Sequence, residues 1–346
     1  MNRIASLDGF RAISIILVVF SHFRFLDWFP SSMYAFAKQC DVGVNVFFVI
    51  SGFLITTLLL KEQQKEKTIS LKKFFIGRAF RILPVFFVYF MFICIYNYFV
   101  DLEISKTNFI HAITFTANFD QDRNWFLGHF WTLAVEQQFY LFWPLTLLLF
   151  RKNLKMITLA FIAYSCIVRV IVYKFHLDPT IFLHPFFAVS DSILIGAFTA
   201  ILYQEHPQHF AKKIFNNYYL QVIAVLLIIF FVNASANGRF ALISLPFGNT
   251  IIAFAIMYLI LSYIDIRTNL VYKFLNAKLI VHIGVLSYSI YIWQQFFFGK
   301  DYISFLGNFP LNIVLIYLVS LASYYLLEKP LIGLRKRYAS IKLIPS

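Results

Sequence analysis

Long apolar segments separated by short polar stretches run the length of this 346-residue chain. A helix needs about 20 predominantly apolar residues to cross the hydrocarbon core of a bilayer. Because backbone groups in lipid must be paired within the protein, such segments fold as helices. The sequence therefore predicts an all-α, polytopic membrane protein with about ten transmembrane helices, near residues 10–27, 43–60, 83–100, 126–150, 156–175, 181–203, 218–233, 245–263, 279–298 and 304–327.

The composition argues against a soluble globular enzyme. Hydrophobic residues make up 60% of the chain and charged residues 13%, whereas soluble domains average about 45–50% and about 25%. In a soluble protein, the net charge of +14 would suggest a nucleic-acid partner. Here the basic residues lie in short stretches between apolar segments, which is typical of a membrane protein. We therefore expect the lipid bilayer, and not nucleic acid, as a partner.

The distribution of Lys and Arg predicts the orientation. These residues concentrate in the stretches 61–81, 151–155, 212–213, 267–278 and 329–342. Because cytoplasmic loops carry the excess of basic residues, we expect both termini in the cytoplasm. No loop is long enough for a separate domain, so residues 1–346 should form a single membrane domain. The widely spaced Cys40, Cys94 and Cys166 form no metal motif, and we expect no metal.

The first apolar segment is bracketed by Arg11 and His22. Eleven residues correspond to three helical turns plus about 20°, with a rise of about 16 Å, so both side chains should share one helix face. Charged and titratable groups inside a span usually face a bundle interior or a water-filled cavity. Snorkelling of each residue to its nearest membrane surface is the alternative. The shared face favours a common internal channel.

The fourth apolar segment carries several polar residues at helical spacing. His129, Thr132, Glu136 and Tyr140 should share a face. A Glu deep in a span stays protonated when it is alone, but beside a His or Arg it ionises and can orient that partner. A buried ion pair that fixes helix packing is the alternative for Glu136.

Two shorter patterns also indicate function or packing. Ser51 and Gly52 lie mid-span, where small residues permit close helix approach or a local break in the helix. Ser51 lacks the G-x-S-x-G context of a nucleophilic serine. Arg78 and Arg81 are three residues apart on one side of a helix. Such a pair suits phosphate binding, and ordinary anchoring at the cytoplasmic surface is the alternative.

The remaining intramembrane polar residues have simpler explanations. Arg169 and Asp191 lie in adjacent predicted spans, where we expect a structural ion pair. Tyr288, Tyr291 and Trp293 lie near the outer end of the ninth segment. Aromatic residues are enriched at membrane interfaces, which would explain them.

These motifs together resemble the acyltransferase-3 family, the bacterial membrane O-acyltransferases of the O-antigen acetylase type. The resemblance covers most of the chain and rests on six motifs in order: LDGFRAISIILVVFSH, GVNVFFVISGFLI, GRAFRILP, HFWTLAVEQQFYLFWP, IGVLSYSIYIWQ and YYLLEKPL. It implies transfer of an acyl group, usually acetyl, from cytoplasmic acyl-CoA to a carbohydrate hydroxyl at or beyond the outer face. It also implies location in the bacterial cytoplasmic (inner) membrane.

The resemblance assigns functional residues to this sequence. The family's Arg-x10-His pair falls on Arg11 and His22, its R-x-x-R pair on Arg78 and Arg81, and its membrane Glu on Glu136. The family often carries an appended extracytoplasmic hydrolase-like domain. We expect none in this chain, so such a partner would be a separate protein or would be absent.

One departure from the family lies in the ninth segment. The family motif often ends Y-L-W-H, whereas this chain has Ile292, Trp293 and Gln294. If the family's His serves proton transfer, this protein does without it. We therefore assign Gln294 no catalytic role.

The resemblance and the spacing together suggest a mechanism. Arg78 and Arg81 would hold the phosphates of acetyl-CoA, and Arg11 would guide its pantetheine arm toward His22. His22 would act as general base on the acceptor hydroxyl, or would first accept the acetyl group itself; both routes are open. Glu136 would orient the imidazole and stabilise its charged form.

Three further residues are weaker candidates for the site, and two other functions are alternatives to acyl transfer. Ser51 is a candidate oxyanion donor, and His129 and Tyr140 are candidates for substrate binding. The acceptor would be a cell-surface carbohydrate or lipid-linked glycan, such as O-antigen or exopolysaccharide. A non-enzymatic glycolipid or polysaccharide transporter is the main alternative, and a polysaccharide polymerase is the third. Acetyl-CoA binding distinguishes the enzyme from the transporter.

Overall fold

A computed structural model describes residues 4–178, 186–206, 215, 217–264, 269–299 and 307–334. All of the regular secondary structure in these residues is helical, and no strand occurs among them. The α-helices are α1 (Ala5–His22), α2 (Tyr34–Gln39), α3 (Gly43–Glu66), α4 (Leu71–Val100), α5 (Lys106–Ile113), α6 (Trp125–Gly128), α7 (Phe130–Leu149), α8 (Leu154–Lys174), α10 (Phe186–Val189), α11 (Asp191–Glu205), α13 (Tyr218–Ala236), α14 (Ala241–Ile264), α15 (Leu270–Leu275), α16 (Lys278–Phe297) and α17 (Leu311–Ser323). A π-helical turn, η6 (Tyr324–Glu328), continues α17.

Local sequence explains several helix ends. The helix α3 stops at Glu66 because Lys67 adopts a left-handed conformation with φ of 61°. Ser70 then caps α4, its hydroxyl accepting the backbone N–H of Lys73 at 3.3 Å. Asn124 caps α6 in the same way. Such caps satisfy backbone donors that have no partner within the helix.

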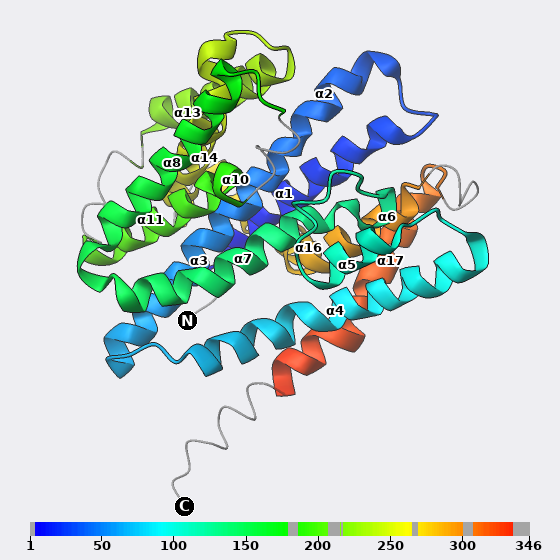
Figure 1. Cartoon of the computed structure of the whole chain (residues 1–346), viewed down its shortest axis with the longest axis horizontal. Helices are drawn as coiled ribbons and strands as arrows, with labels where there is room; N and C mark the ends of the chain where they lie inside the picture. Colours follow the sequence, from blue (N-terminus) through cyan, green and yellow to red (C-terminus); the bar gives the residue numbers. More distant parts are fainter. Residues whose placement is uncertain are drawn as a thin grey trace, which may run out of the picture.

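The first helix lies at the centre of the bundle. In Figure 1, α8, α11, α13 and α14 form one group of helices, α4 and α17 lie on the other side, and α1 and α3 run between them. The helix α1 packs against both α3 and α16, and α3 packs against α11 and α14. The helix that carries Arg11 and His22 is therefore surrounded by protein on several sides.

The described residues contain seven helical segments long and apolar enough to cross a membrane. The remaining three of the ten predicted spans fall on α7, α11 and α16, which lie near the predicted positions but are not among the seven. The described part of α11 is only 15 residues long. The other two helices turn polar side chains inward, including Glu136 and Gln294. The fold is thus all-helical as predicted, and the full number of spans and their direction stay predictions.

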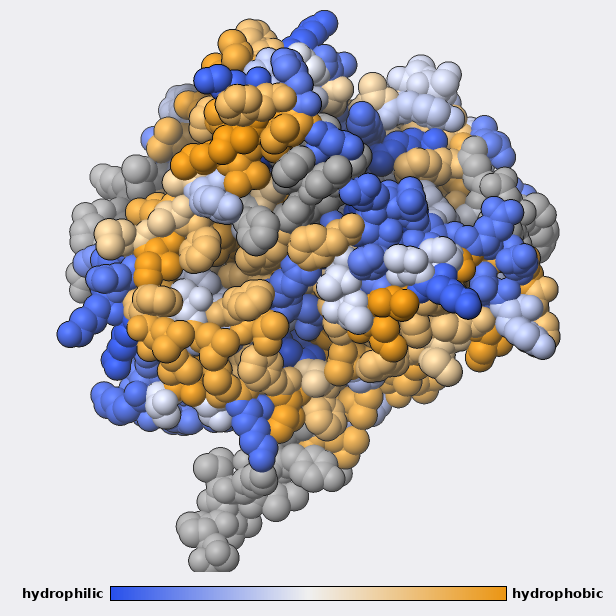
Figure 2. Space-filling view, in the orientation of Figure 1, coloured by the Kyte–Doolittle hydropathy of each residue, from blue (hydrophilic) through white to orange (hydrophobic). Residues whose placement is uncertain are grey.

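The outer surface is that of a multi-pass membrane protein. Figure 2 shows apolar side chains over the region of α4 and α7, whereas hydrophilic side chains gather over α5 and the segment before α6. Large apolar side chains that are exposed include Tyr98, Phe99, Leu149 and Leu326. Soluble monomers rarely expose apolar patches larger than a few hundred Å². This surface is suited to lipid.

The crossing of α3 and α11 depends on two glycines. A methyl group at Gly52 would lie 1.8 Å from the carbonyl oxygen of Ile193, and one at Gly196 would lie 2.1 Å from that of Val49. Both neighbours are backbone atoms, so no side chain can rotate away. The prediction that Gly52 permits close helix approach is confirmed.

Replacing Gly52 by Ala should therefore force α3 and α11 apart. Overpacking of this kind costs about 1–3 kcal/mol. We expect Gly52→Ala to lower the thermal unfolding midpoint of the purified protein in detergent. Gly333→Ala is the control, because a methyl group there meets nothing within 4 Å. Equal midpoints for the two variants would contradict the close crossing.

Candidate active site

Two of the cavities formed by the described residues contain the predicted site residues. The His cavity, of about 800 Å³, is lined by His22 and His129 among others. The Arg cavity, of about 240 Å³, is lined by Arg11, Arg78 and Arg81 among others. The two share the side chains of Val44, Phe48 and Tyr291, which we call the collar. The collar separates one cavity from the other.

The predicted arginines converge in the Arg cavity, although they come from α1 and α4. One Arg11 nitrogen lies 3.2 Å from the Asp8 carboxylate, one turn earlier on α1. The Arg78 guanidinium lies 5.8 Å from the centres of the Phe74 and Tyr140 rings. Aromatic faces attract cations. The cavity therefore concentrates positive charge, of which the Asp8 carboxylate offsets a part.

Glu136 lies in the same cavity and is held by two hydroxyl groups. The Ser51 hydroxyl donates to Oε1 of Glu136 at 2.6 Å, and the Tyr140 hydroxyl donates to Oε2 at 3.3 Å. The structure therefore brings Ser51, from another helix, to Glu136 and Tyr140, which were predicted to share a face. Because the Ser51 proton is used in the bond to Glu136, the suggested role of Ser51 as an oxyanion donor finds no support.

His22 has a different partner from the one predicted. Its Nδ1 lies 3.1 Å from Oε1 of Gln294, a fully buried side chain on α16. Glu136 lines the Arg cavity and contacts Ser51 and Tyr140 instead. The prediction that Glu136 orients the imidazole is wrong, because the collar lies between their cavities. Gln294 makes the orienting contact.

With the Gln294 amide in this orientation, the contact favours one tautomer of a neutral His22 ring. An amide carbonyl only accepts hydrogen bonds, so Nδ1 carries the hydrogen and donates it. Nε2 then keeps the lone pair of the neutral ring. A neutral imidazole with a free lone pair is the form required of a base or nucleophile.

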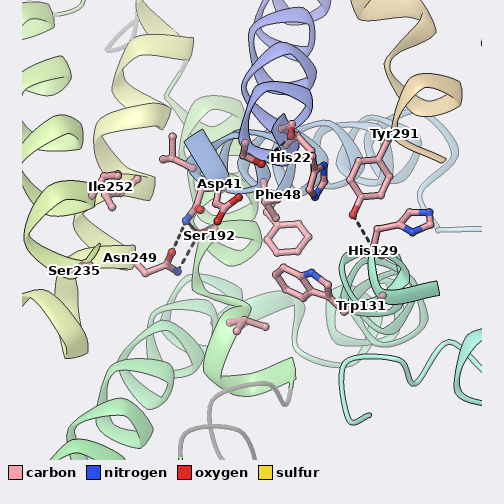
Figure 3. A pocket seen from close by; sticks show the side chains of 18 of the residues that line it. His22, Asp41, Phe48, His129, Trp131, Ser192, Ser235, Asn249, Ile252 and Tyr291 are labelled. Atoms are coloured by element: carbon pink, nitrogen blue, oxygen red, sulfur yellow. Dashed lines mark hydrogen bonds between the residues drawn. The ribbon is translucent and has the colours of Figure 1, made fainter. Parts of the chain in front are cut away.

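His129 does not share the face predicted for it. The helix α7 begins at Phe130, so His129 occupies the junction with α6, whereas Thr132, Glu136 and Tyr140 line the Arg cavity together. The His129 side chain is only 5% exposed. Its ring lies between 4.5 and 5.6 Å from the centres of the Tyr89, Phe130 and Tyr291 rings. Figure 3 shows the Tyr291 hydroxyl directed toward the His129 backbone.

A buried ion pair supports the wall of the His cavity away from His22. Arg169 lies 2.7 Å from the Asp191 carboxylate, and its other nitrogens donate to the carbonyls of Pro246 and Ala188. Thr250 also donates to Asp191 at 2.5 Å. The predicted structural ion pair is confirmed. Its hydrogen bonds join α8, α11 and α14.

Two amide side chains on this wall escaped the sequence analysis. Asn249 donates to Asp191 at 2.6 Å, and Asn45 donates to Ser192 at 3.2 Å and to Asn249. Figure 3 shows Ser192 and Asn249 on the opposite side of the cavity from His129. Asn45 lies in the apolar run GVNVFFVISGFLI. An isolated amide in such an apolar run is the feature of the sequence that could have identified Asn45 as a cavity residue.

Aromatic and charged residues complete the His cavity. The Phe25 and Trp125 rings pack at 4.8 Å, and Trp131 lines the same space. Arg24 is paired with Asp41 at 3.0 Å. Arg123 also lines the cavity, from the segment before α6. Burial lowers the pKa of its guanidinium, and the carboxylate of Asp120 acts against that shift.

The aromatic residues of α16 are not interfacial. Tyr291 lines both cavities. Trp293 is 9% exposed and packs 5.4 Å from Tyr89. The Tyr288 hydroxyl donates to the Ile82 carbonyl at 2.7 Å. The interfacial explanation was wrong because these rings face neighbouring helices.

Across the described ranges, no group of three or more His, Cys, Asp or Glu side chains is placed to hold a metal.

Comparisons with known proteins identify similar sequences. The family described as "Acyltransferase domain" matches residues 4–329. The peptidoglycan O-acetyltransferase OatA of Listeria monocytogenes is 36% identical over 44% of this chain and 25% of its own length. The O-acetyltransferase OatA of Staphylococcus aureus is 29% identical over 94% of this chain and 56% of its own length. The chain thus spans only part of these relatives. No solved structure matches it.

The two cavities should be reachable from opposite membrane faces, because Arg11 and His22 lie about 16 Å apart along α1. Cysteines would be introduced singly at Ser235 in the His cavity or Leu58 in the Arg cavity. The free cysteines Cys40, Cys94 and Cys166 would first be replaced. We expect a membrane-impermeant maleimide to label the two positions from opposite sides. Labelling of both from one side would contradict the arrangement.

Proposed function

Since the chain belongs to the acyltransferase-3 family, we propose that it transfers an acetyl group from cytoplasmic acetyl-CoA to a hydroxyl of a cell-surface carbohydrate or glycolipid. The observation that carries the proposal is the arrangement of the two cavities. One concentrates Arg11, Arg78 and Arg81, the other holds His22, and the collar is common to both. Such a pair of cavities suits two substrates that arrive from opposite faces of a membrane.

The Arg cavity suits the donor. Acetyl-CoA carries a pyrophosphate and a 3′-phosphate, and guanidinium groups bind phosphate oxygens through paired hydrogen bonds. We assign Arg78 and Arg81 to these phosphates and Arg11 to the pantetheine arm. The Glu136 carboxylate, fixed by Ser51 and Tyr140, would accept a hydrogen bond from a pantetheine amide. This role replaces the one predicted for Glu136 beside His22.

The His cavity suits a carbohydrate acceptor. Its volume of about 800 Å³ lies within the usual range of roughly 300–1,000 Å³ for ligand sites. The rings of Trp125 and Trp131 offer apolar faces for a sugar ring, and the amide oxygens of Asn45 and Asn249 can accept hydrogen bonds from its hydroxyls. The similar proteins from Listeria and Staphylococcus are named O-acetyltransferases, and one name specifies peptidoglycan. We include peptidoglycan, O-antigen and exopolysaccharide as acceptors to be tested.

The chemistry we propose centres on His22. Nε2 removes the proton of the acceptor hydroxyl while the oxygen attacks the thioester carbonyl. The tetrahedral intermediate collapses, the carbon–sulfur bond breaks, and the imidazolium returns the proton to the sulfur of CoA. The products are the acetyl ester and free CoA. Throughout, the Nδ1 contact to Gln294 keeps the ring in place.

The location we propose is the bacterial cytoplasmic membrane, with both termini and the Arg cavity on the cytoplasmic side. Acetyl-CoA is a cytoplasmic metabolite, and basic loops favour this orientation. The acceptor would enter the His cavity from the other side. A separate extracytoplasmic protein would carry the acetyl group onward where the acceptor is a distant polymer.

The first test is acetyl transfer by the purified protein in nanodiscs. Labelled acetyl-CoA would be supplied with a polysaccharide or glycolipid fraction from the source cell. We expect His22→Ala to abolish transfer, by at least about 100-fold since a general base contributes roughly 10²–10⁴, and to leave acetyl-CoA binding unchanged. Arg78→Ala with Arg81→Ala should weaken that binding by at least about tenfold, because each charged hydrogen bond contributes about 1.5–3 kcal/mol.

Matched controls exist for both substitutions. His282→Ala removes a histidine that lines neither cavity, and Lys72→Ala removes an exposed cation at the start of α4. Neither should change transfer. Folded wild type that does not bind acetyl-CoA would reject the enzyme in favour of the transporter. Label trapped covalently on His22 would replace direct transfer by a two-step route.

The Gln294 contact yields a separate prediction. Gln294→Leu removes the acceptor of the Nδ1 hydrogen, so the ring loses its fixed orientation. We expect kcat to fall about 10- to 100-fold, as misplacement by about 1 Å can cost 100-fold, with KM for acetyl-CoA unchanged. Gln294→Glu keeps an oxygen acceptor and should retain more activity than Gln294→Leu. Equal losses in the two variants, or a change confined to KM, would contradict the orienting role.

A further inference from the structure

We propose that the collar of Val44, Phe48 and Tyr291 limits the acyl group to acetyl and that Phe48 is the main determinant of this selectivity. The inference rests on the proposed function and concerns the acyl group that the donor carries. The relevant observation is that the two cavities share only these side chains among the residues that line them. The similar proteins are named O-acetyltransferases, and no comparison says which residues limit the acyl group.

The acyl group has to pass the collar to reach His22. The arginines assigned to the phosphates of CoA lie in the Arg cavity, and His22 lies in the His cavity. The pantetheine arm therefore has to extend from one cavity toward the other with the acyl group at its tip. The width of the collar then decides which acyl groups arrive.

Hydrogen bonds fix the Tyr291 side of the collar. The Tyr291 hydroxyl donates to the His129 carbonyl at 2.7 Å and lies 2.5 Å from the Thr132 hydroxyl. His129 lies at the junction of α6 and α7, and Thr132 lies in the first turn of α7. The Phe47 ring also packs 6.3 Å from the Tyr291 ring. The Tyr291 ring is thus held from two helices and has little freedom to move aside.

Packing fixes the Phe48 side. Phe48 is 4% exposed, and its ring packs perpendicular to that of Trp131 at a centroid distance of 6.1 Å. Phe48 lies one turn before Gly52 on α3, where the backbone contact with Ile193 allows no closer approach of α11. Figure 3 shows Phe48, Trp131 and Tyr291 grouped near His22. A longer acyl chain would have to displace one of these packed rings.

The test compares acyl-CoA donors of increasing length. Wild type and Phe48→Ala would receive acetyl-, propionyl- or butyryl-CoA with the same acceptor fraction. One extra methylene is typically discriminated by roughly 10- to 200-fold in a close-fitting pocket. We therefore expect wild type to prefer acetyl strongly, and we expect Phe48→Ala to raise the butyryl-to-acetyl ratio of kcat/KM at least about tenfold.

Two further variants keep the test decisive. Phe48→Leu is the milder change and should give an intermediate ratio, so it replaces Phe48→Ala if that variant does not fold. Leu54→Ala is the matched control, because Leu54 lies on the same helix and lines only the Arg cavity. We expect it to leave the ratio unchanged.

The outcomes separate this inference from the proposed function. Acetyl transfer that persists in both Phe48 variants with an unchanged ratio would overturn the inference and leave the function intact. Wild type that uses butyryl-CoA as well as acetyl-CoA would do the same. Wild type that is folded but transfers no acyl group would overturn the proposed function, and the inference with it.

Discussion

A polar group inside a membrane bundle has to be paired with another group or face a cavity, because lipid offers it no hydrogen bond. The arrangement of helices around α1 follows from this constraint. Arg11 lies at one end of the helix with Asp8 and the Arg cavity, and His22 lies at the other end with Gln294 and the His cavity. Each polar side chain thus requires a helix beside it that supplies a partner or encloses a space.

The same constraint is met in a different way in each cavity. The wall around Arg169 and Asp191 is tied together by short hydrogen bonds that join three helices. In the Arg cavity, Glu136 is paired with two hydroxyl groups and Arg11 with Asp8. For the proposed reaction, the hydrogen-bonded wall of the His cavity would favour a defined orientation of the sugar.

The sequence indicated which residues line the cavities better than it indicated their partners. Helical spacing and motifs pointed to Arg11, His22, Arg78, Arg81 and Glu136, all of which line one of the two cavities, and their roles stay predictions. Spacing gives the face of a single helix, but it does not give the rotation of that helix relative to its neighbours. The partner of His22 therefore could not be predicted, and neither could the cavity in which Glu136 lies. Gln294 was noticed as a departure from the family and was given no role for the same reason.

The number of membrane-spanning helices was also difficult to predict. The helices α7 and α16 carry inward-facing polar residues that lower their apolar character.

The collar has an electrical consequence. If water filled both cavities, the collar of Val44, Phe48 and Tyr291 would be the layer between the two bodies of water, and a transmembrane voltage would fall mainly across it. A unit charge that crosses this layer exchanges about 2.3 kcal/mol per 100 mV with the field. In the proposed reaction, the acetyl group is neutral and would cross this layer at no electrical cost, while the phosphates of the donor would stay in the Arg cavity. The proposed transfer would therefore be independent of the membrane potential.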